Sequence, residues 1–374
     1  MPLTGFGIDL YTPSFPAMAA QLNTAYSAIK MTVSIYLLGL CLGQIMFGTW
    51  SDKYGRKPTF LMGSAGFMVA SLLVPFIPNI YLIMLVRFIQ GFFVGAVAVN
   101  CRCLIADIYT KDEIPIASTY MTIAWSLGPI IAPLIGGYLQ FYLSWKSNFY
   151  FLAGYAALIS LTIYFFVRET NLHKVKHSLS KIIADYLLIL KHNQFLGALI
   201  LMAVGYAMLV IFPLVSPFIV QNVFHKTSVF YGRLALLIGA SYLAGSLINR
   251  YLLNFFMSEV LIRHGLNCLI LLSSAFLIIS LIYKQTLFTL YAPMILIVIS
   301  ISLFFPNCMG KSISYFPKMA GKAGAVVGTG FMFLTAIISI ITNYLPIHNQ
   351  LSISITFLIL ACLGLYGHKL LSNP

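Results

Sequence analysis

Apolar runs long enough to cross a bilayer recur along the whole chain, with short polar connectors between them. An apolar stretch of about 18 residues or more with few charges is typical of a transmembrane helix. The pattern predicts twelve such segments, and the longest polar interval, residues 168–191, falls between the sixth and the seventh. The predicted spans are residues 1–21, 31–51, 58–78, 80–107, 115–142, 147–167, 194–222, 228–253, 261–283, 286–312, 319–344 and 349–371.

This arrangement predicts an all-α membrane protein made of two bundles of six helices. The N-terminal bundle would comprise residues 1–167, a cytoplasmic linker residues 168–193, and the C-terminal bundle residues 194–374. The first span begins abruptly, because Met1 is only eight residues before Asp9, the acid inside it. Either the first helix is short or the chain lacks its natural beginning, and we expect the second.

Composition supports a membrane protein and argues against a nucleic-acid-binding one. The chain has 374 residues, of which 60% are hydrophobic and 8% charged, and its mean hydropathy is +0.94. The net charge is +14, but the basic residues are divided among short connectors and form no single patch. Most Lys and Arg residues lie in connectors that follow even-numbered spans, which places those connectors and both termini in the cytoplasm.

Asp9 is the only acid deep inside a predicted span. A carboxylate in hydrocarbon costs roughly 3 kcal/mol even on lenient insertion scales, so it is expected to face water, pair with a cation or carry a proton. Pro13 and Pro16 follow closely and interrupt the backbone hydrogen bonds of the helix. Arg87, the only basic residue deep in a span, could pair with Asp9 and release it on protonation, or it could join helices by binding backbone carbonyls.

The connector between the second and third spans reads Gly48-x-x-x-Asp52-x-x-Gly55-Arg56-Lys57. Gly48 allows close helix approach, and Gly55 permits a backbone bend that other residues resist. Asp52 could cap a neighbouring helix or pair with Arg56. Without other motifs, the connector could also be an ordinary basic cytoplasmic loop.

Together with other motifs in order, this connector resembles the signature loop of the major facilitator superfamily. Within that superfamily the chain is most similar to the Bcr/CflA drug-resistance transporters. Arg87-x-x-Gln90-Gly91 is similar to a motif of the fourth helix, and the fifth span carries the proline-glycine pattern of drug/proton antiporters. That pattern comprises Gly128, Pro129, Pro133, Gly136 and Gly137. The Bcr/CflA likeness rests on Asp9, Tyr11, Pro13 and Pro16, on Ser216-Pro217-Phe218, on Pro306-Asn307, and on Phe316-Pro317 with Ala320-Gly321.

The resemblance implies the major facilitator fold and assigns roles to these motifs. Asp9 and Arg87 would couple transport to protons, and the proline-glycine pattern would relate to export direction. On residue chemistry alone, that pattern only bends the helix and lets a neighbour approach closely. The cytoplasmic gate motif would comprise Gly48, Asp52, Gly55, Arg56, Lys57 and Asp107. Because Ala106 stands where the family has an arginine before Asp107, we expect fewer ion pairs at this gate.

Aromatic and amide side chains are candidates for a substrate cavity, because aromatic walls suit flat and apolar substrates. Most tyrosines of membrane proteins lie instead at lipid interfaces. The candidates are Tyr36, Gln90, Tyr120, Trp125, Tyr206 and Tyr242.

No phosphate-binding loop, metalloprotease motif or nucleophile elbow is present, so we expect no enzyme activity, no metal and no cofactor. Transport would then draw on an ion gradient, with the proton as coupling ion. Together with the resemblance, the sequence predicts proton-coupled efflux of drug-like small molecules across a bacterial inner membrane, and the resemblance implies a monomer. The alternative is an exporter dedicated to one metabolite, such as an amino acid or a siderophore. A receptor or scaffold would need a sizeable soluble segment, which the linker does not supply.

Overall fold

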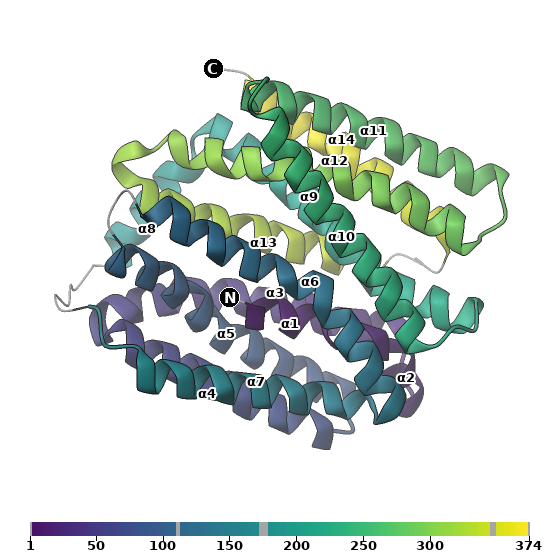
Figure 1. Ribbon diagram of the computed structural model, residues 1–374, viewed down its shortest axis with the longest axis horizontal. Coiled ribbons are helices and arrows are strands. Elements are labelled where there is room, and N and C mark those ends of the chain that lie inside the picture. The colour runs from purple at the N-terminus through teal and green to yellow at the C-terminus, as the bar shows by residue number, and fades with distance from the viewer. Residues whose placement is uncertain (1, 110–112, 172–178, 345–348, 373–374) are drawn as a thin grey trace. The chain divides into compact units, whose positions relative to one another are not determined.

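The computed structural model describes residues 2–109, 113–171, 179–344 and 349–372, and gives the backbone only for residues 114–119, 122–127, 179–183, 318 and 320. The described chain is helical and contains no β-strand (Figure 1). The first half contains α1 (Pro2–Asp9), η1 (Thr12–Ser14), α2 (Phe15–Gln21), α3 (Tyr26–Tyr54), α4 (Arg56–Leu73), η2 (Val74–Phe76), α5 (Ile80–Ile108), α6 (Ile114–Tyr142) and α7 (Trp145–Phe166). The rest contains α8 (Leu179–Leu190), α9 (Asn193–Phe218), η3 (Ile219–Val223), α10 (Ser228–Leu252), α11 (Ser258–Ile282), α12 (Leu287–Ser314), η4 (Pro317–Met319), α13 (Ala320–Tyr344) and α14 (Gln350–Ser372).

Each predicted span coincides with a helix or with a broken helix. Within the described residues, ten helices are long and apolar enough to cross a membrane. The other two spans correspond to α6, a 29-residue helix, and to the first span, which is broken into α1, η1 and α2. The predicted twelve-helix architecture is therefore consistent with the structure.

The sequence analysis did not predict helix α8, which lies within the linker. Its sequence, LSKIIADYLLIL, has an amphipathic pattern that is easily overlooked among the basic residues of the linker. Ile189 is fully buried, and the Asp185 carboxylate pairs with Lys322 Nζ at 2.6 Å. The second half of the linker is thus bonded to α13.

The chain forms two compact units. The first comprises Met1–Leu179 and Lys226–Ala235, and the second comprises Ser180–His225 and Leu236–Pro374. The first two turns of α10 therefore pack within the first unit. The division into bundles at residues 1–167 and 194–374 stays a prediction.

Glycines bring α3 and α5 into direct backbone contact. A Cβ atom on Gly39 would lie on the backbone oxygen of Phe88, and one on Gly91 would lie on the backbone oxygen of Tyr36. Gly43, four residues after Gly39, meets the backbone of α5 in the same way. Small residues at this spacing are the common means of close helix packing in membranes. Asp52 lies in α3 and Arg87 lies in α5, so this packing holds the helices that carry both residues together.

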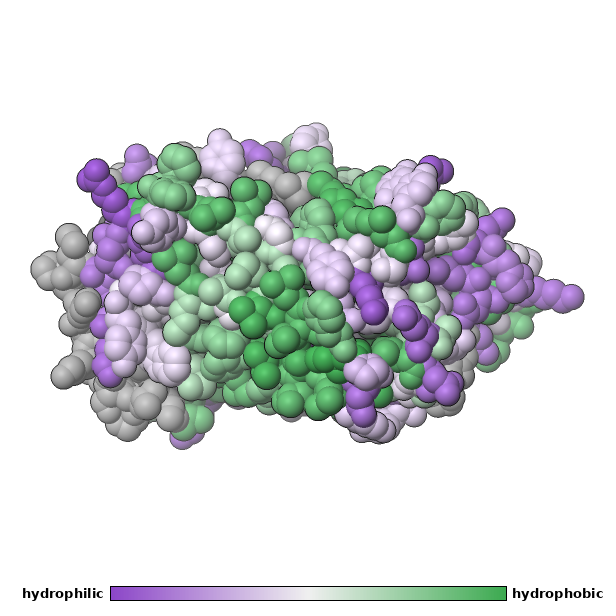
Figure 2. Space-filling view, turned by 90° about the horizontal axis from the view of Figure 1, so that it is seen from below, coloured by the Kyte–Doolittle hydropathy of each residue, from purple (hydrophilic) through white to green (hydrophobic). Residues whose placement is uncertain are grey.

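The helix faces that meet no other helix are apolar along their middle. Figure 2 shows the side on which α4 and α7 lie in Figure 1, with hydrophobic side chains over its centre and hydrophilic ones toward its ends. Val69, Leu158 and Leu161 are each more than half exposed on these two helices. Exposed apolar side chains at this density indicate a surface that faces lipid.

Candidate functional site

The first span is broken directly after Asp9. Pro13 and Pro16 lie in the first turns of η1 and α2, where a missing N–H is tolerated. The Thr12 hydroxyl donates to the Asp9 backbone oxygen at 2.9 Å, and the Ser14 N–H donates to the Tyr11 carbonyl at 2.9 Å. These local bonds hold the break in shape and place Asp9 at the C-terminal end of the short helix α1.

The Asp9 side chain is buried but unpaired. Asp9 is 9% exposed, and no described residue gives its carboxylate a hydrogen bond or an ion pair. An ionised carboxylate with no partner is costly in an apolar interior, whereas a protonated one is tolerated far better. Asp9 is therefore a candidate for proton binding.

Arg87 does not bind Asp9. Its guanidinium is fully buried, and Nη2 donates to the backbone oxygen of Gly7 at 2.6 Å while Nη1 donates to Gln90 Oε1. The rings of Tyr11 and Tyr36 each lie 4.4 Å from the guanidinium carbon, so the charge sits between two aromatic faces. Of the two arrangements left open by the sequence, the structure contains the bond from Arg87 to a backbone carbonyl.

The candidate cavity residues occupy different surroundings. Tyr36 and Gln90 both contact Arg87, through the Tyr36 ring and Gln90 Oε1. The Tyr36 hydroxyl also donates to the Thr4 backbone oxygen at 3.2 Å, and Gln90 Nε2 donates to Ser71 Oγ at 2.6 Å. In the second unit, Tyr206 packs edge-on against Phe331, with ring centres 5.3 Å apart, and Tyr242 is half-buried. Tyr120 is exposed, and the side chain of Trp125 lies outside the described residues.

The glycines of the proline-glycine pattern in α6 contact two other segments. A Cβ atom on Gly136 would lie on the carbonyl oxygen of Leu10, the residue after Asp9. One on Gly137 would lie 2.6 Å from the backbone oxygen of Ser228 in α10, whose hydroxyl donates to the Gly137 oxygen at 2.9 Å. A Cβ atom on Gly128 would lie 3.3 Å from the Cα atom of Gly5 in α1. Pro129 and Pro133 lie inside this helix, which packs closely on both sides of the Asp9 break.

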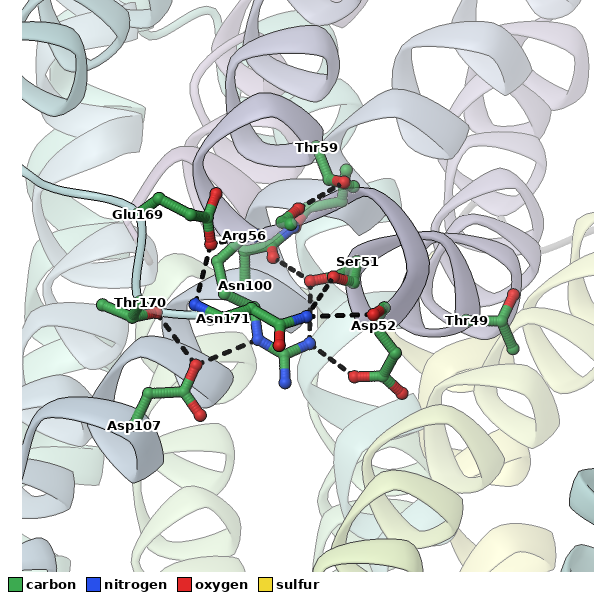
Figure 3. Close-up of polar contacts among 12 residues, drawn as sticks. Thr49, Ser51, Asp52, Arg56, Thr59, Asn100, Asp107, Glu169, Thr170 and Asn171 are labelled. Carbon is green, nitrogen blue, oxygen red and sulfur yellow. Dashed lines mark hydrogen bonds and ion pairs between the residues drawn. The ribbon is translucent and has the colours of Figure 1, made fainter. Parts of the chain in front are cut away.

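The gate motif forms a compact charge cluster at the turn between α3 and α4 (Figure 3). Arg56 Nη1 lies 2.6 Å from Asp52 Oδ1, and Arg56 Nε lies 3.0 Å from Asp107 Oδ2 at the end of α5. Arg56 Nη1 also donates to Ser51 Oγ at 3.0 Å. Although Ala106 replaces the family arginine, Asp107 therefore keeps an ion pair. Arg102, one turn earlier, donates instead to the side chain of Gln44.

Glu169 is a member of this cluster that sequence reasoning missed. Its Oε1 accepts from the backbone N–H of Arg56 at 2.8 Å, and its Oε2 accepts from that of Lys57 at 3.1 Å. Glu169 thus caps the N-terminus of α4, where the preceding residue, Gly55, has no side chain to do so. Gly55 has φ +112°, and a Cβ atom there would lie 2.5 Å from Glu169 Oε2. The glycine is thus required for its backbone conformation, and a larger residue would also displace the Glu169 carboxylate.

The two residues after Glu169 attach the linker to the same turn. Thr170 Oγ1 donates to Asp107 Oδ2 at 2.9 Å. Asn171 Nδ2 donates to the backbone oxygens of Ser51 at 3.2 Å and Asp52 at 3.0 Å. The sequence did carry a sign of this role for Glu169. It is an isolated acid between the end of the sixth span and the basic linker, and the third span is preceded by Gly-Arg-Lys.

We predict that Glu169→Gln lowers stability by about 1 kcal/mol at neutral pH, the usual cost of a lost helix cap. Burial works to raise the pKa of Glu169, but hydrogen bonds from the backbone N–H groups of Asn171, Arg56, Lys57 and Thr170 outweigh it and hold the pKa below its ordinary value of 4.5. The stabilisation is therefore present above pH 4.5 and is lost as the pH falls through the lower folded-state pKa. Thermal melting of parent and variant in detergent at several pH values measures this.

The difference in melting temperature between the parent and Glu169→Gln should shrink at acid pH, because the Glu169 carboxylate of the parent is then protonated. Glu259→Gln is the matched control, since Glu259 pairs with Lys311 at an exposed position and should change melting less. Equal melting of Glu169→Gln and parent at neutral pH would contradict the capping role.

Comparison with known proteins identifies the family. The family model described as Major Facilitator Superfamily matches residues 3–340. The chain belongs to this superfamily. It is therefore a multi-pass membrane transporter for small molecules, not an enzyme.

Relatives of this transporter include drug-resistance proteins. It is 24% identical to the bicyclomycin resistance protein homolog of Haemophilus influenzae, over 87% of this chain and 82% of the relative. It is also 24% identical to multidrug resistance protein D of Escherichia coli, over 95% of this chain and 89% of the relative. The predicted likeness to Bcr/CflA-type transporters is thus confirmed.

A solved structure supports the fold. The crystal structure of a D-xylose-proton symporter is 14% identical and superposes with a TM-score of 0.76, covering 100% of this chain and 94% of that one. At this identity the similarity shows the fold alone, and the fold is that of the major facilitator superfamily.

Proposed function

We propose that this transporter exports drug-like small molecules in exchange for protons, by alternating access, with Asp9 as the proton carrier. The observation that carries the proposal is the unpaired Asp9 carboxylate, buried at a break in the first span. The buried Arg87 guanidinium already binds Gly7 and Gln90. Protonation is therefore the simplest way to neutralise Asp9.

One proton per cycle supplies enough free energy for export. A proton that crosses about 100 mV gains about 2.3 kcal/mol, and one pH unit adds about 1.4 kcal/mol. The sum of about 3.7 kcal/mol sustains a gradient of several hundred-fold when the exported substrate carries no net charge. A single carrier acid is sufficient, and no cofactor besides the proton is required.

Two further features support this proposal. The relatives include drug-resistance proteins of bacteria, among them a chloramphenicol resistance protein of Pseudomonas aeruginosa that is 29% identical over 46% of this chain. The distribution of Lys and Arg favours cytoplasmic termini. We therefore place the transporter in a bacterial inner membrane, with both termini in the cytoplasm, and we expect it to act as a monomer.

The test is transport by purified protein in liposomes with an imposed pH gradient. A panel of unrelated antibiotics, including bicyclomycin and chloramphenicol, is supplied on the side opposite the higher proton concentration. We expect several compounds to move against their own gradients at least tenfold, and a protonophore to abolish that movement. Movement that is unaffected by the protonophore would exclude proton coupling.

The same panel separates broad export from the alternative function. If only a single metabolite such as an amino acid or a siderophore is moved, the transporter is a dedicated exporter on the same fold. Movement of several chemically unrelated compounds would exclude that alternative.

A further inference from the structure

The first turns of α7 hold the broken first span at several points. Trp145 Nε1 donates to Gln21 Oε1 at the end of α2. The ring of Phe149 lies 5.3 Å from the ring of Tyr11, which follows Asp9 by two residues. Between them, Asn148 Nδ2 donates to Ser14 Oγ in η1 at 2.7 Å.

Asn148 has a side-chain oxygen without a hydrogen-bond partner in the described structure, and the carbonyl of Leu10 lacks the donors that normally follow it along the chain. Asn148 is fully buried, and its Oδ1 has no partner in the described structure. The donors nearest along the chain cannot serve the Leu10 carbonyl, because Pro13 has no N–H and the Ser14 N–H binds Tyr11. Buried polar oxygens are seldom left unpaired, so this pair needs an explanation.

The two oxygens lie against the same glycine of α6. A Cβ atom on Gly136 would lie on the Leu10 carbonyl oxygen, and the same atom would be 3.4 Å from Asn148 Oδ1. A half-turn of the Asn148 carboxamide about its last torsion exchanges its oxygen and its nitrogen. The amide nitrogen then takes the position beside Gly136, where the Leu10 carbonyl also lies, and the Ser14 hydroxyl donates to the amide oxygen.

We propose that Asn148 is a positioning residue for Asp9, because its carboxamide bridges Leu10 and Ser14, the two ends of the break. This inference rests on the proposed proton-carrier role of Asp9. Leu10 is bonded directly to Asp9, so fixing its carbonyl also fixes the direction in which the Asp9 side chain leaves the backbone. Gly136 leaves the space in which the carboxamide reaches that carbonyl.

Packing alone does not explain an asparagine at this position. A leucine, which has the same branched skeleton, would fill the space without burying an amide, which costs free energy unless its hydrogen bonds are made. Polar side chains inside membrane-spanning helices more often serve function than packing. The carboxamide matches what the break lacks, a donor on one side and an acceptor on the other.

The test compares Asn148→Leu and Ser14→Ala with Ser160→Ala. Ser160 lies on the same helix and bonds Ser64 of α4 at 2.7 Å, twelve residues from Asn148, so its substitution removes a hydrogen bond of α7 away from the break. The first readout is labelling of Asp9 by dicyclohexylcarbodiimide at fixed pH, measured by peptide mass spectrometry. The second is the pH profile of proton-driven exchange.

We expect Asn148→Leu to change the rate of Asp9 labelling about fivefold, which corresponds to about 1 kcal/mol for a lost hydrogen bond. We also expect it to move the midpoint of the pH profile by about half a pH unit or more. Ser14→Ala should have a smaller effect of the same kind, and it serves as the test if Asn148→Leu does not fold. Ser160→Ala should change neither readout.

If Asn148→Leu and Ser14→Ala label and titrate like Ser160→Ala, the positioning role is overturned. A uniform loss of exchange rate with an unchanged pH profile and unchanged labelling would also overturn it, because that is the result of a merely structural role. If the parent shows no proton-driven exchange, the proposed function fails, and Asp9 labelling still decides whether Asn148 positions this carboxyl.

Discussion

Asp9→Asn is expected to abolish proton-coupled export while the protein still inserts and folds. Asparagine matches aspartate in shape but cannot gain or lose a proton, so the roughly 3.7 kcal/mol available from one proton can no longer drive the substrate. Because the carboxylate has no partner among the described residues, the substitution removes no ion pair. The melting temperature should therefore stay equal to that of the parent or rise.

The measurement is a pH jump applied to proteoliposomes loaded with an exported compound. Net uphill movement should fall at least about a hundredfold in Asp9→Asn, whereas exchange of labelled for unlabelled substrate across the membrane should continue. Asp185→Asn is the control, because Asp185 pairs with Lys322 in the linker helix and should leave proton coupling intact. Uphill transport by Asp9→Asn at the parental rate would exclude Asp9 as the carrier.

The arrangement of spans could be predicted from the sequence because the bilayer imposes it. A segment that crosses hydrocarbon must satisfy its backbone internally and must be apolar over about 20 residues, and both conditions are local. The break after Asp9 was also foreseeable, since Pro13 and Pro16 are visible in the sequence. Helix α8 was not predicted, because its short amphipathic pattern lies inside a basic connector.

The chemistry around Asp9 and at the gate could be predicted only in part. The motif residues Asp52 and Arg56 form an ion pair, one of the two contacts that the sequence left open for Asp52, and this pair depends on a spacing of four residues. The cap that Glu169 provides joins residues more than a hundred positions apart, and no pattern of hydropathy encodes such a contact. Likewise, sequence could not decide between the two roles of Arg87, because the outcome depends on where the Gly7 carbonyl lies in space.

The contacts at the gate and the contacts at the break after Asp9 have one structural consequence in common. At the gate, the start of the linker is bonded to the turn that carries Asp52 and Arg56. At the break, α6 and α7 are packed or bonded to the residues that follow Asp9. Within the first unit, both motif regions are thus held by segments distant in sequence, so substitutions in α6, α7 or the linker should alter transport without contacting substrate.

Gly136→Ala should be the most damaging single substitution among the glycines of α6. An added methyl group would lie on the Leu10 carbonyl oxygen, and that carbonyl belongs to backbone rather than to a movable side chain. Either α6 or the break must shift, which we expect to cost about 3 kcal/mol or more, at the upper end of overpacking effects. The shift would also displace Asp9, so proton-driven export should be lost even in protein that remains folded.

Gly154→Ala provides the matched control on α7, because nothing lies within 4 Å of a Cβ atom at that position. Alanine is about 1 kcal/mol more favourable than glycine in a helix interior, so this variant should melt at or slightly above the parental temperature. The comparison is made by thermal melting in detergent and by pH-driven transport in liposomes. Parental melting and transport by Gly136→Ala would show that the close contact between α6 and the break is not needed, and the coupling of α6 to Asp9 would then have to be abandoned.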